Sequence, residues 1–514
     1  MKLAWATEPA SFRLLSFVLS LLLLAFYLPA STWTGNEENY FQLAYRRIAP
    51  DAFSPWSSVF DHANARVVAE TLYGKLIELL GYESAHLVAR VGTAALYAAG
   101  LAVMFGSVRL SLVESVTVVL TFHLLGEQVL GGEWLFDGTE PKTIAYALIF
   151  FAIGAANLGR WRAVVLTCGG ATWIHFLVGG FWSLALGLCA VWQLRPDWRA
   201  VARLVGAYVL MIAPLLAIIV HDQFATVSSL PLPHVDDVVP KVAEIYAWRN
   251  AHHVSPFVNP AIFPHWRRGF VALGVAIVAF AILWRRRPPG ALLLALAGVG
   301  LAELVLAVVI SYLDQDRLAL AKLYLFRPSS VTLLLLVSAA VIAIRRAASP
   351  RFRAWFTGAP VLVLATLQAL QLIHPRDRLR AGNAPTLPHE AGLIAAIRAS
   401  SSEGEIVVLD PELDPTLGGI RLSRLIDRPT VVALKFVPTA PQDIQRWYLL
   451  LRWRERLFED GCAGGTHAVP VKLIITSSPG AMERVANCGT VIWRRDDMAV
   501  VDRASVPAGS ADSP

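Results

Sequence analysis

The run Leu14-Leu-Ser-Phe-Val-Leu-Ser-Leu-Leu-Leu-Leu-Ala-Phe-Tyr-Leu28 carries no charged side chain. Further along the chain, several apolar runs reach the roughly 20 residues that a helix needs to cross a bilayer. Of the 514 residues, 56% are hydrophobic and only 16% are charged, against about 25% charged residues in soluble chains. The sequence therefore predicts a mainly α protein, a bundle of transmembrane helices. A cleaved signal peptide is the alternative for the first run, because Lys2 and Arg13 precede it and Pro29-Ala30-Ser31 follows it.

Basic residues between the apolar runs set the expected orientation. We predict about eleven spans, near residues 14–32, 87–107, 112–126, 143–159, 163–175, 178–194, 201–220, 269–284, 291–312, 329–344 and 355–373. Short Arg-containing turns lie on one side, so the positive-inside rule puts those turns and the N-terminus in the cytoplasm. The segments 163–175 and 178–194 are short and form either two spans or a re-entrant hairpin, and both choices keep the same sidedness. The net charge of +7 thus reflects orientation, and with no nucleic-acid motif present we exclude nucleic acid as a partner.

This topology divides the chain into two domains and a tail. Residues 1–373 form the transmembrane domain, and its polar loops gather on the outer face, at 33–86, 127–142, 221–268 and 313–328. Residues 374–505 form a small extracytoplasmic α/β domain with strands predicted near 405–410, 431–434 and 472–476. If this domain is outside the cytoplasm, Cys462 and Cys488 can form a disulfide. Residues 506–514, rich in Ser, Ala and Pro, are expected to be disordered.

The first outer loop holds the acidic sequence Gly35-Asn-Glu37-Glu38-Asn39, and Asp61 follows in the same loop. Two adjacent carboxylates at a membrane boundary are energetically costly unless they bind a cation, a base or a sugar. We therefore take Glu37, Glu38 and Asp61 as candidate catalytic residues. The alternative is that Glu37 and Glu38 merely cap a helix. Apolar residues recur every four positions at Val68, Leu72, Leu76 and Leu80, which predicts an amphipathic helix along the membrane surface.

Candidate substrate-binding residues lie at the boundaries of later spans. Trp134 can stack on a sugar face, Glu140 is a second candidate acid, and Lys142 can meet a phosphate as a point charge. The alternative for Lys142 is a snorkelling side chain. His175, in Trp173-Ile-His175-Phe, is either a site residue or a buried core histidine, and Arg327 is either a bidentate phosphate ligand or an interfacial anchor. The histidines of the third loop match no metal-binding spacing.

The whole plan resembles the GT-C superfamily of integral-membrane glycosyltransferases. Many spans, an acidic pair in the first outer loop, an interfacial helix after it and an outer C-terminal domain carry the resemblance. Asn36-Glu-Glu-Asn39 departs from the Asp-containing forms of that pair. The stretch 132–142, with Gly-Glu-Trp and Glu-Pro-Lys, also resembles a bacterial subgroup, from which no residue role is carried over. The resemblance implies an inverting enzyme of the cytoplasmic membrane that takes a sugar from a polyprenyl-phosphate donor.

Under this hypothesis, Arg327 and Lys142 neutralise the phosphate leaving group and Glu37 or Glu38 is the general base. Asp61 or Glu140 positions the acceptor or a divalent cation such as Mg²⁺ or Mn²⁺. The acceptor is a glycan, a lipid or a protein, and no motif distinguishes these. Two alternatives stay open. One is a transporter or flippase of a lipid-linked sugar or anionic solute, with Glu303 and Arg90 as deep charges. The other is a non-catalytic membrane scaffold.

Overall fold

The structure, a computed structural model, describes residues 14–20, 22, 33–50, 56–57, 63–136, 138–194, 197–224, 238–286, 291–347, 349, 390–413, 419–463 and 469–503. The predicted span near 355–373, most of the span near 14–32 and the tail 506–514 lie outside these residues. Asp61 lies outside them too.

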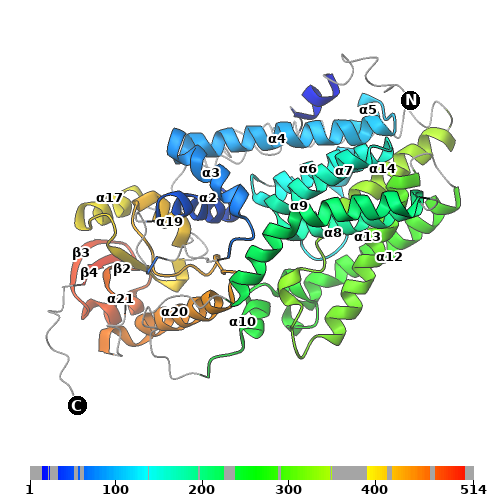
Figure 1. The fold of residues 1–514 in the computed structure, drawn as a ribbon. Helices are drawn as coiled ribbons and strands as arrows, with labels where there is room; N and C mark the ends of the chain where they lie inside the picture. The colour runs from blue at the N-terminus through cyan, green and yellow to red at the C-terminus, as the bar shows by residue number, and fades with distance from the viewer. Residues whose placement is uncertain are drawn as a thin grey trace.

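Apolar helices dominate the part of the chain that the structure describes, and they form one bundle (Figure 1). The bundle consists of α4 (Tyr82–Ser107), α5 (Leu112–Leu124), α6 (Pro141–Asn157), α7 (Trp161–Ile174), α8 (Phe176–Gln193), α9 (Trp198–Phe224), α12 (Phe263–Arg286), α13 (Ala291–Leu313) and α14 (Ser329–Ala347). Among the described residues, 6 helices are long and apolar enough to cross a membrane, and α5 and α6 are shorter apolar helices. The predicted multi-pass helical fold is confirmed.

Small residues let α4 and α6 pack closely at the centre of the bundle. A Cβ atom added to Gly100 of α4 would lie 2.6 Å from the carbonyl oxygen of Ala147, and one added to Gly154 of α6 would lie 2.7 Å from Val103 Cγ1. Membrane helices use such residues because close backbone contact replaces the hydrophobic driving force that lipid cannot supply. The start of α6 is thereby fixed against α4, and that start carries the polar groups described below.

Short helices lie between this bundle and the C-terminal domain: α2 (Gly35–Ile48), α3 (Val67–Leu80), α10 (Val242–Arg249), α11 (Ala251–Val254), and the 3₁₀ turns η2 (Pro260–Ile262) and η3 (Ala321–Leu323) (Figure 1). The predicted amphipathic helix is α3. It packs on α2 and leaves Val68, Leu72 and Leu79 exposed, as expected for a helix on a membrane surface.

The C-terminal domain is a 4-stranded sheet with helices on both faces. The strands β1 (Ile406–Leu409), β2 (Val471–Thr476), β3 (Thr490–Arg495) and β4 (Met498–Asp502) are ordered β1-β2-β4-β3, and only the β1–β2 pair is parallel. Because side chains alternate along a strand, Ile406 and Val408 pack into one core, while Val407 and Leu409 pack into the other. The first core is covered by α20 (Pro441–Asp460) and α21 (Pro479–Ala486), the second by α17 (Glu390–Ser400) and α19 (Gly419–Ile426).

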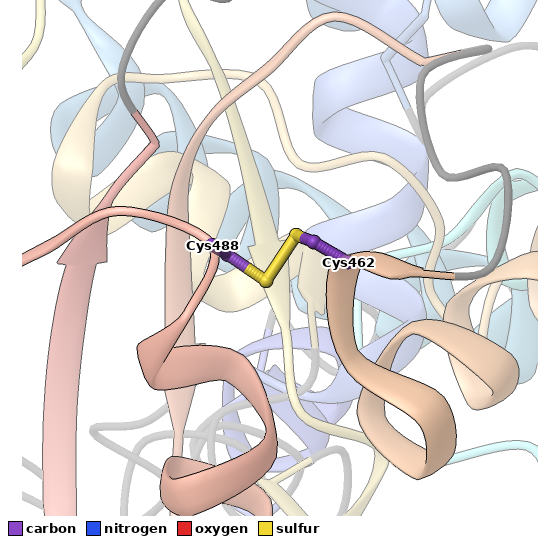
Figure 2. Close-up of a disulfide and its surroundings, with 2 residues drawn as sticks. All are labelled: Cys462 and Cys488. Carbon is purple, nitrogen blue, oxygen red and sulfur yellow. A yellow bond between two sulfur atoms is a disulfide. The ribbon is translucent and has the colours of Figure 1, made fainter.

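Two expectations for this domain have different outcomes. The strand predicted at 431–434 was wrong, since only Thr430 bridges to Val407 of β1 and the chain then leaves the sheet. Val431 and Val432 are buried in the core that α20 covers, and Ala433 is buried with Phe436 against Leu43 of α2. The disulfide between Cys462 and Cys488 is present, with a Cα–Cα distance of 5.3 Å, and it ties the end of α20 to the end of α21 (Figure 2).

Candidate active site

A cavity of about 790 Å³ lies where one end of the helix bundle meets α2, α10 and the C-terminal domain. Its size is typical of ligand-binding sites. Five of the predicted site residues line it: Trp134, Glu140, Lys142, His175 and Arg327. They come from three places in the sequence, the loop before α6, the junction of α7 and α8, and the turn before α14.

The loop before α6 is held by buried hydrogen bonds to its backbone. The Glu127 carboxylate accepts from the backbone N–H groups of Leu135 and Phe136, both at 2.9 Å. The Ser329 hydroxyl at the start of α14 accepts from Val129 and Leu130, at 2.9 and 2.8 Å. These bonds satisfy buried donors of an irregular segment, so the loop has one defined conformation. It presents Glu133 and Trp134 to the cavity.

Glu133 joins the two predicted phosphate-binding cations. The carboxylate lies 3.1 Å from Lys142 Nζ and accepts from Arg327 Nη1 at 2.8 and 3.0 Å. Burial alone raises the pKa of Glu133, but the charges of Arg327 and Lys142 outweigh it and hold that pKa below its usual value. Lys142 is itself buried and lies 3.5 Å from the centre of the Trp134 ring. Lys142 is thus enclosed by protein and paired with Glu133, which does not fit the alternative of a snorkelling side chain.

Glu140 is the carboxylate of this cavity with unused hydrogen-bonding capacity. It precedes Pro141 at the start of α6 and is 1% exposed. Its Oε1 atom is buried with no hydrogen-bond partner in the part of the chain described here, and its Oε2 atom lies 3.9 Å from Lys142 Nζ. Burial raises the pKa of Glu140, and Lys142 and Asn36 lower it too little to compensate. A buried carboxyl with a raised pKa is suited to acid–base chemistry near neutral pH.

Helix α2 turns its amides, not its two glutamates, toward the cavity. Asn36, Asn39 and Tyr40 line the cavity wall, because residues three and four apart share one face of a helix. Glu37 and Glu38 are not among the lining residues. The alternative of a capping role is realised for Glu37, which forms a capping box with Thr34.

Glu37 and Glu38 are both bound by arginines. Arg90 donates to the two oxygens of Glu37 at 2.9 and 2.6 Å, and His86 Nε2 lies 3.1 Å away. Burial raises the pKa of Glu37, but the contacts with His86 and Arg90 outweigh it and lower the pKa to about 2. Glu38 accepts two hydrogen bonds, each of 2.8 Å, from Arg424 of the C-terminal domain. Glu37 therefore joins α2 to α4, and Glu38 joins α2 to the C-terminal domain.

His175 forms the break between α7 and α8. Its backbone is extended, and its Nδ1 atom accepts from the backbone N–H of Val178 at 3.3 Å, which caps α8. The side chain is buried, and the residue also lines the cavity. His175 is therefore a buried capping residue on the cavity wall, and its role as a site residue stays a prediction.

Several cavity residues escaped the sequence analysis as site residues: Tyr40, Arg66, Asp222, Tyr246, His252 and His253. Asp222, at the end of α9, accepts from the backbone N–H of Asn64 at 2.6 Å and fixes the neighbouring Arg66 segment. The rings of His252 and His253 lie with their centres 4.0 Å apart and their planes tilted by 44°. Burial is the largest cause that lowers their pKa values, to about 4 and about 3, so both are neutral at pH 7. The clustering of these residues depends on contacts across loops, which spacing does not reveal.

The described residues contain no group of three or more His, Cys, Asp or Glu side chains arranged to hold a metal ion. Glu133 is already bound by two cations, and Glu140 offers one unpartnered oxygen. The predicted Mg²⁺ or Mn²⁺ stays a prediction, because Asp61, one of its two predicted ligands, lies outside the described residues, and the ion enters no step proposed below.

A solved structure shares this fold. The crystal structure of ArnT from Cupriavidus metallidurans in the apo state matches with a TM-score of 0.51 and 14% sequence identity, over 95% of this chain and 97% of that one. ArnT is a GT-C glycosyltransferase. No protein-family model and no curated protein sequence matches. The comparison confirms the predicted resemblance at the level of fold.

Proposed function

We propose that this protein is a membrane glycosyltransferase that moves a sugar from a polyprenyl-phosphate donor to a hydroxyl group of an acceptor. The observation that carries the proposal is the cavity itself. Lys142, which is buried, and Arg327, which is partly buried, both pair with Glu133 and line the same cavity as Glu140, a buried carboxylate with an unpartnered oxygen. A phosphate leaving group needs the first feature, and a hydroxyl nucleophile needs the second. The GT-C-like fold supports the same class of reaction.

In the proposed reaction, the donor phosphate binds to Lys142 and Arg327 at the ends of α6 and α14. An acceptor oxygen then attacks the anomeric carbon from the opposite side. The bond from that carbon to the phosphate oxygen breaks as the new glycosidic bond forms. The phosphate leaves with the electron pair and is stabilised by the two cations, and the acceptor proton passes to Glu140. This single displacement inverts the anomeric configuration.

The choice of base differs from the first expectation for physical reasons. Glu37 is fully enclosed and its oxygens are occupied by Arg90 and by the backbone N–H of Thr139 at 2.8 Å. Its pKa near 2 makes it a poor proton acceptor at neutral pH. Glu140 has an unpartnered oxygen and a raised pKa, and it lies in the cavity wall. Asp61 stays a predicted site residue outside the described part of the chain.

We place this reaction on the outer face of the cytoplasmic membrane, with the N-terminus inside and the C-terminal domain outside. The disulfide supports this, since disulfides persist in oxidising compartments and not in the cytoplasm. Arg285 and Arg286 at the end of α12 and Arg345 and Arg346 at the end of α14 lie at the opposite end of the bundle from the cavity, as the positive-inside rule requires.

The test is donor turnover. The purified protein is incubated with a panel of radiolabelled polyprenyl-phosphate sugars, beside Glu140→Gln and Lys142→Ala variants. We expect the wild type to release or transfer one donor's sugar, Glu140→Gln to lose that turnover, and Lys142→Ala to turn the donor over more slowly at donor concentrations below its KM. Equal turnover in wild type and variants would remove these residues from the mechanism. The absence of turnover with every donor, in folded protein, would contradict the proposed function.

One observation favours the second candidate function, a transporter of a lipid-linked sugar or anionic solute. Both oxygens of Glu303, within span α13, are buried without a hydrogen-bond partner among the described residues. An intramembrane carboxyl marks a transport pathway in many proteins. The other deep charge, Arg90, is bound to Glu37 and lines no part of the cavity. Flux of labelled lipid-linked sugar across reconstituted vesicles, with Glu303→Gln as the control, separates the two functions.

A further inference from the structure

The C-terminal domain reaches into the candidate active site through one segment. Residues 433–439, termed here the wall segment, leave the sheet after Thr430 and run along the cavity. Lys435, Phe436, Val437 and Thr439 of this segment all line it. These residues lie far from the bundle in sequence, and the cavity is incomplete without them.

Side chains of the outer loops bind the backbone of the wall segment. Arg249 Nε at the end of α10 donates to the carbonyl oxygen of Leu434 at 2.6 Å, and Lys322 Nζ of η3 lies 3.4 Å from the carbonyl oxygen of Thr439. Phe436 is buried against Leu43 of α2. The segment is therefore fixed at several points between α2, α10 and η3.

Arg424 joins the C-terminal domain to α2 at a second place, outside the cavity. Its Nε and Nη2 atoms donate to Glu38 at 2.8 Å each, and its Nη1 atom donates to Glu83 at 2.6 Å. Its guanidinium lies 4.4 Å from the centre of the Trp33 ring. The Arg424 side chain is 12% exposed, so this ion pair is shielded from water and holds the domain against the helix that faces the cavity.

The two sides of the cavity are chemically different. Lys142 and Arg327 belong to membrane helices or their ends, where the phosphate of a lipid-anchored donor lies. The wall segment belongs to a domain with a water-soluble sheet fold, so it faces the partner that arrives from outside the membrane.

We propose that the wall segment is the acceptor-binding side of the active site, an inference that rests on the proposed function. Docking of the C-terminal domain through Arg424 then keeps water from taking the place of the acceptor. Lys435 and Thr439 contribute polar groups toward an acceptor hydroxyl, while Phe436 anchors the segment. Arg424 is a positioning residue in this proposal, since it touches neither substrate. Water that enters an undocked cavity attacks the same anomeric carbon, which releases the free sugar and polyprenyl phosphate.

The test compares sugar release to water, without acceptor, in the full-length wild type and in Arg424→Ala, using the labelled donor that the panel identifies. We expect hydrolysis to rise about tenfold in Arg424→Ala, the effect of weakening closure by about 1.4 kcal/mol, with the donor KM unchanged. Arg424→Lys, which keeps the charge, restores part of the wild-type behaviour. Lys472→Ala is the matched control, because it breaks an ion pair with Asp502 inside the C-terminal domain.

Hydrogen exchange of residues 433–439, which needs no substrate, provides a second readout. Faster exchange there in Arg424→Ala, together with increased hydrolysis, supports the proposal. Unchanged exchange shows that Arg424 does not hold the segment, and unchanged hydrolysis despite faster exchange shows that the segment does not exclude water. Either result overturns the inference. A wild type that consumes no donor contradicts the proposed function instead, and with it the acceptor role, while the exchange result still decides the role of Arg424.

Discussion

Glu37 and Glu140 are both buried carboxylates, yet their surroundings shift their pKa values in opposite directions. At the scale of single residues, this difference predicts the pH dependence of the reaction. A base must be ionised, so activity rises with pH through the raised pKa of Glu140. The acidic limb of the pH–rate profile therefore has its midpoint above the usual Glu pKa of about 4.3. Glu140→Gln lowers kcat by roughly 100-fold or more and removes this limb, whereas a pH–rate profile of Glu140→Gln matching the wild type would exclude Glu140 as the base.

Glu37 is predicted to affect stability instead. Its pKa is about 2 in the fold and 4.5 as the reference, so its ionised form stabilises the fold above pH 4.5, and this contribution is lost as pH falls toward 2. This difference between the two pKa values corresponds to roughly 3 kcal/mol of folding stability. Glu37→Gln should therefore unfold more readily than wild type at pH 7 in detergent, with the gap narrowing in acid. A gap independent of pH would contradict the ionised pair with Arg90.

Lys142 is predicted to bind the donor phosphate. Lys142→Ala should raise the donor KM about tenfold or more, because a charge-assisted contact is lost. Lys75 is the matched control, since its ion pair with Glu78 on α3 is exposed and far from the cavity wall. Donor titrations that give Lys142→Ala and Lys75→Ala the same KM would remove Lys142 from the donor site.

At the scale of elements, the loop before α6 depends on a glycine. Gly131 has a φ of 90°, and a Cβ atom there would lie 2.4 Å from Phe326 Cβ. Gly131→Ala should destabilise the fold by more than about 1 kcal/mol, because the loop must move away from α14. Gly92 of α4 has open space around it, so Gly92→Ala should leave thermal stability unchanged or raised. Equal melting temperatures for the two variants would contradict the close packing of this loop.

Residues of the cavity wall could be predicted from the sequence more readily than their chemical roles. Glu140, Lys142 and Arg327 could be chosen because each lies at the outer end of an apolar helix, and such ends meet at one membrane surface. The face of α2 on which Glu37 lies depends on the residue at which the helix begins. Once Thr34 caps the helix, Asn36 and Tyr40 share one face and Glu37 lies on another. The role of residues 433–439 could not be predicted, since their apolar side chains fit a strand as well as a contact between domains.

At the scale of the whole molecule, the disulfide predicts both stability and sidedness. Cys462 and Cys488 are 26 residues apart, and closing such a loop contributes about 3 kcal/mol. Cys462→Ser should lower the melting temperature of the full protein, and a reductant should affect only the wild type. In sealed right-side-out vesicles, a membrane-impermeant reductant should reach the wild-type disulfide. Reduction only after the membrane is opened would place the C-terminal domain in the cytoplasm.

The most direct measurement of the central claim is sugar turnover from radiolabelled polyprenyl-phosphate donors by the wild type and by Glu140→Gln. Glu37→Gln, which changes another buried carboxylate, is the control. All three proteins are compared at a temperature at which they are folded. The account predicts that wild type consumes one donor, that Glu37→Gln retains turnover and that Glu140→Gln loses it. Turnover that survives in Glu140→Gln but is lost in folded Glu37→Gln would contradict the assignment of Glu140 as the base. No turnover of any donor by the wild type would contradict the proposed glycosyltransferase function.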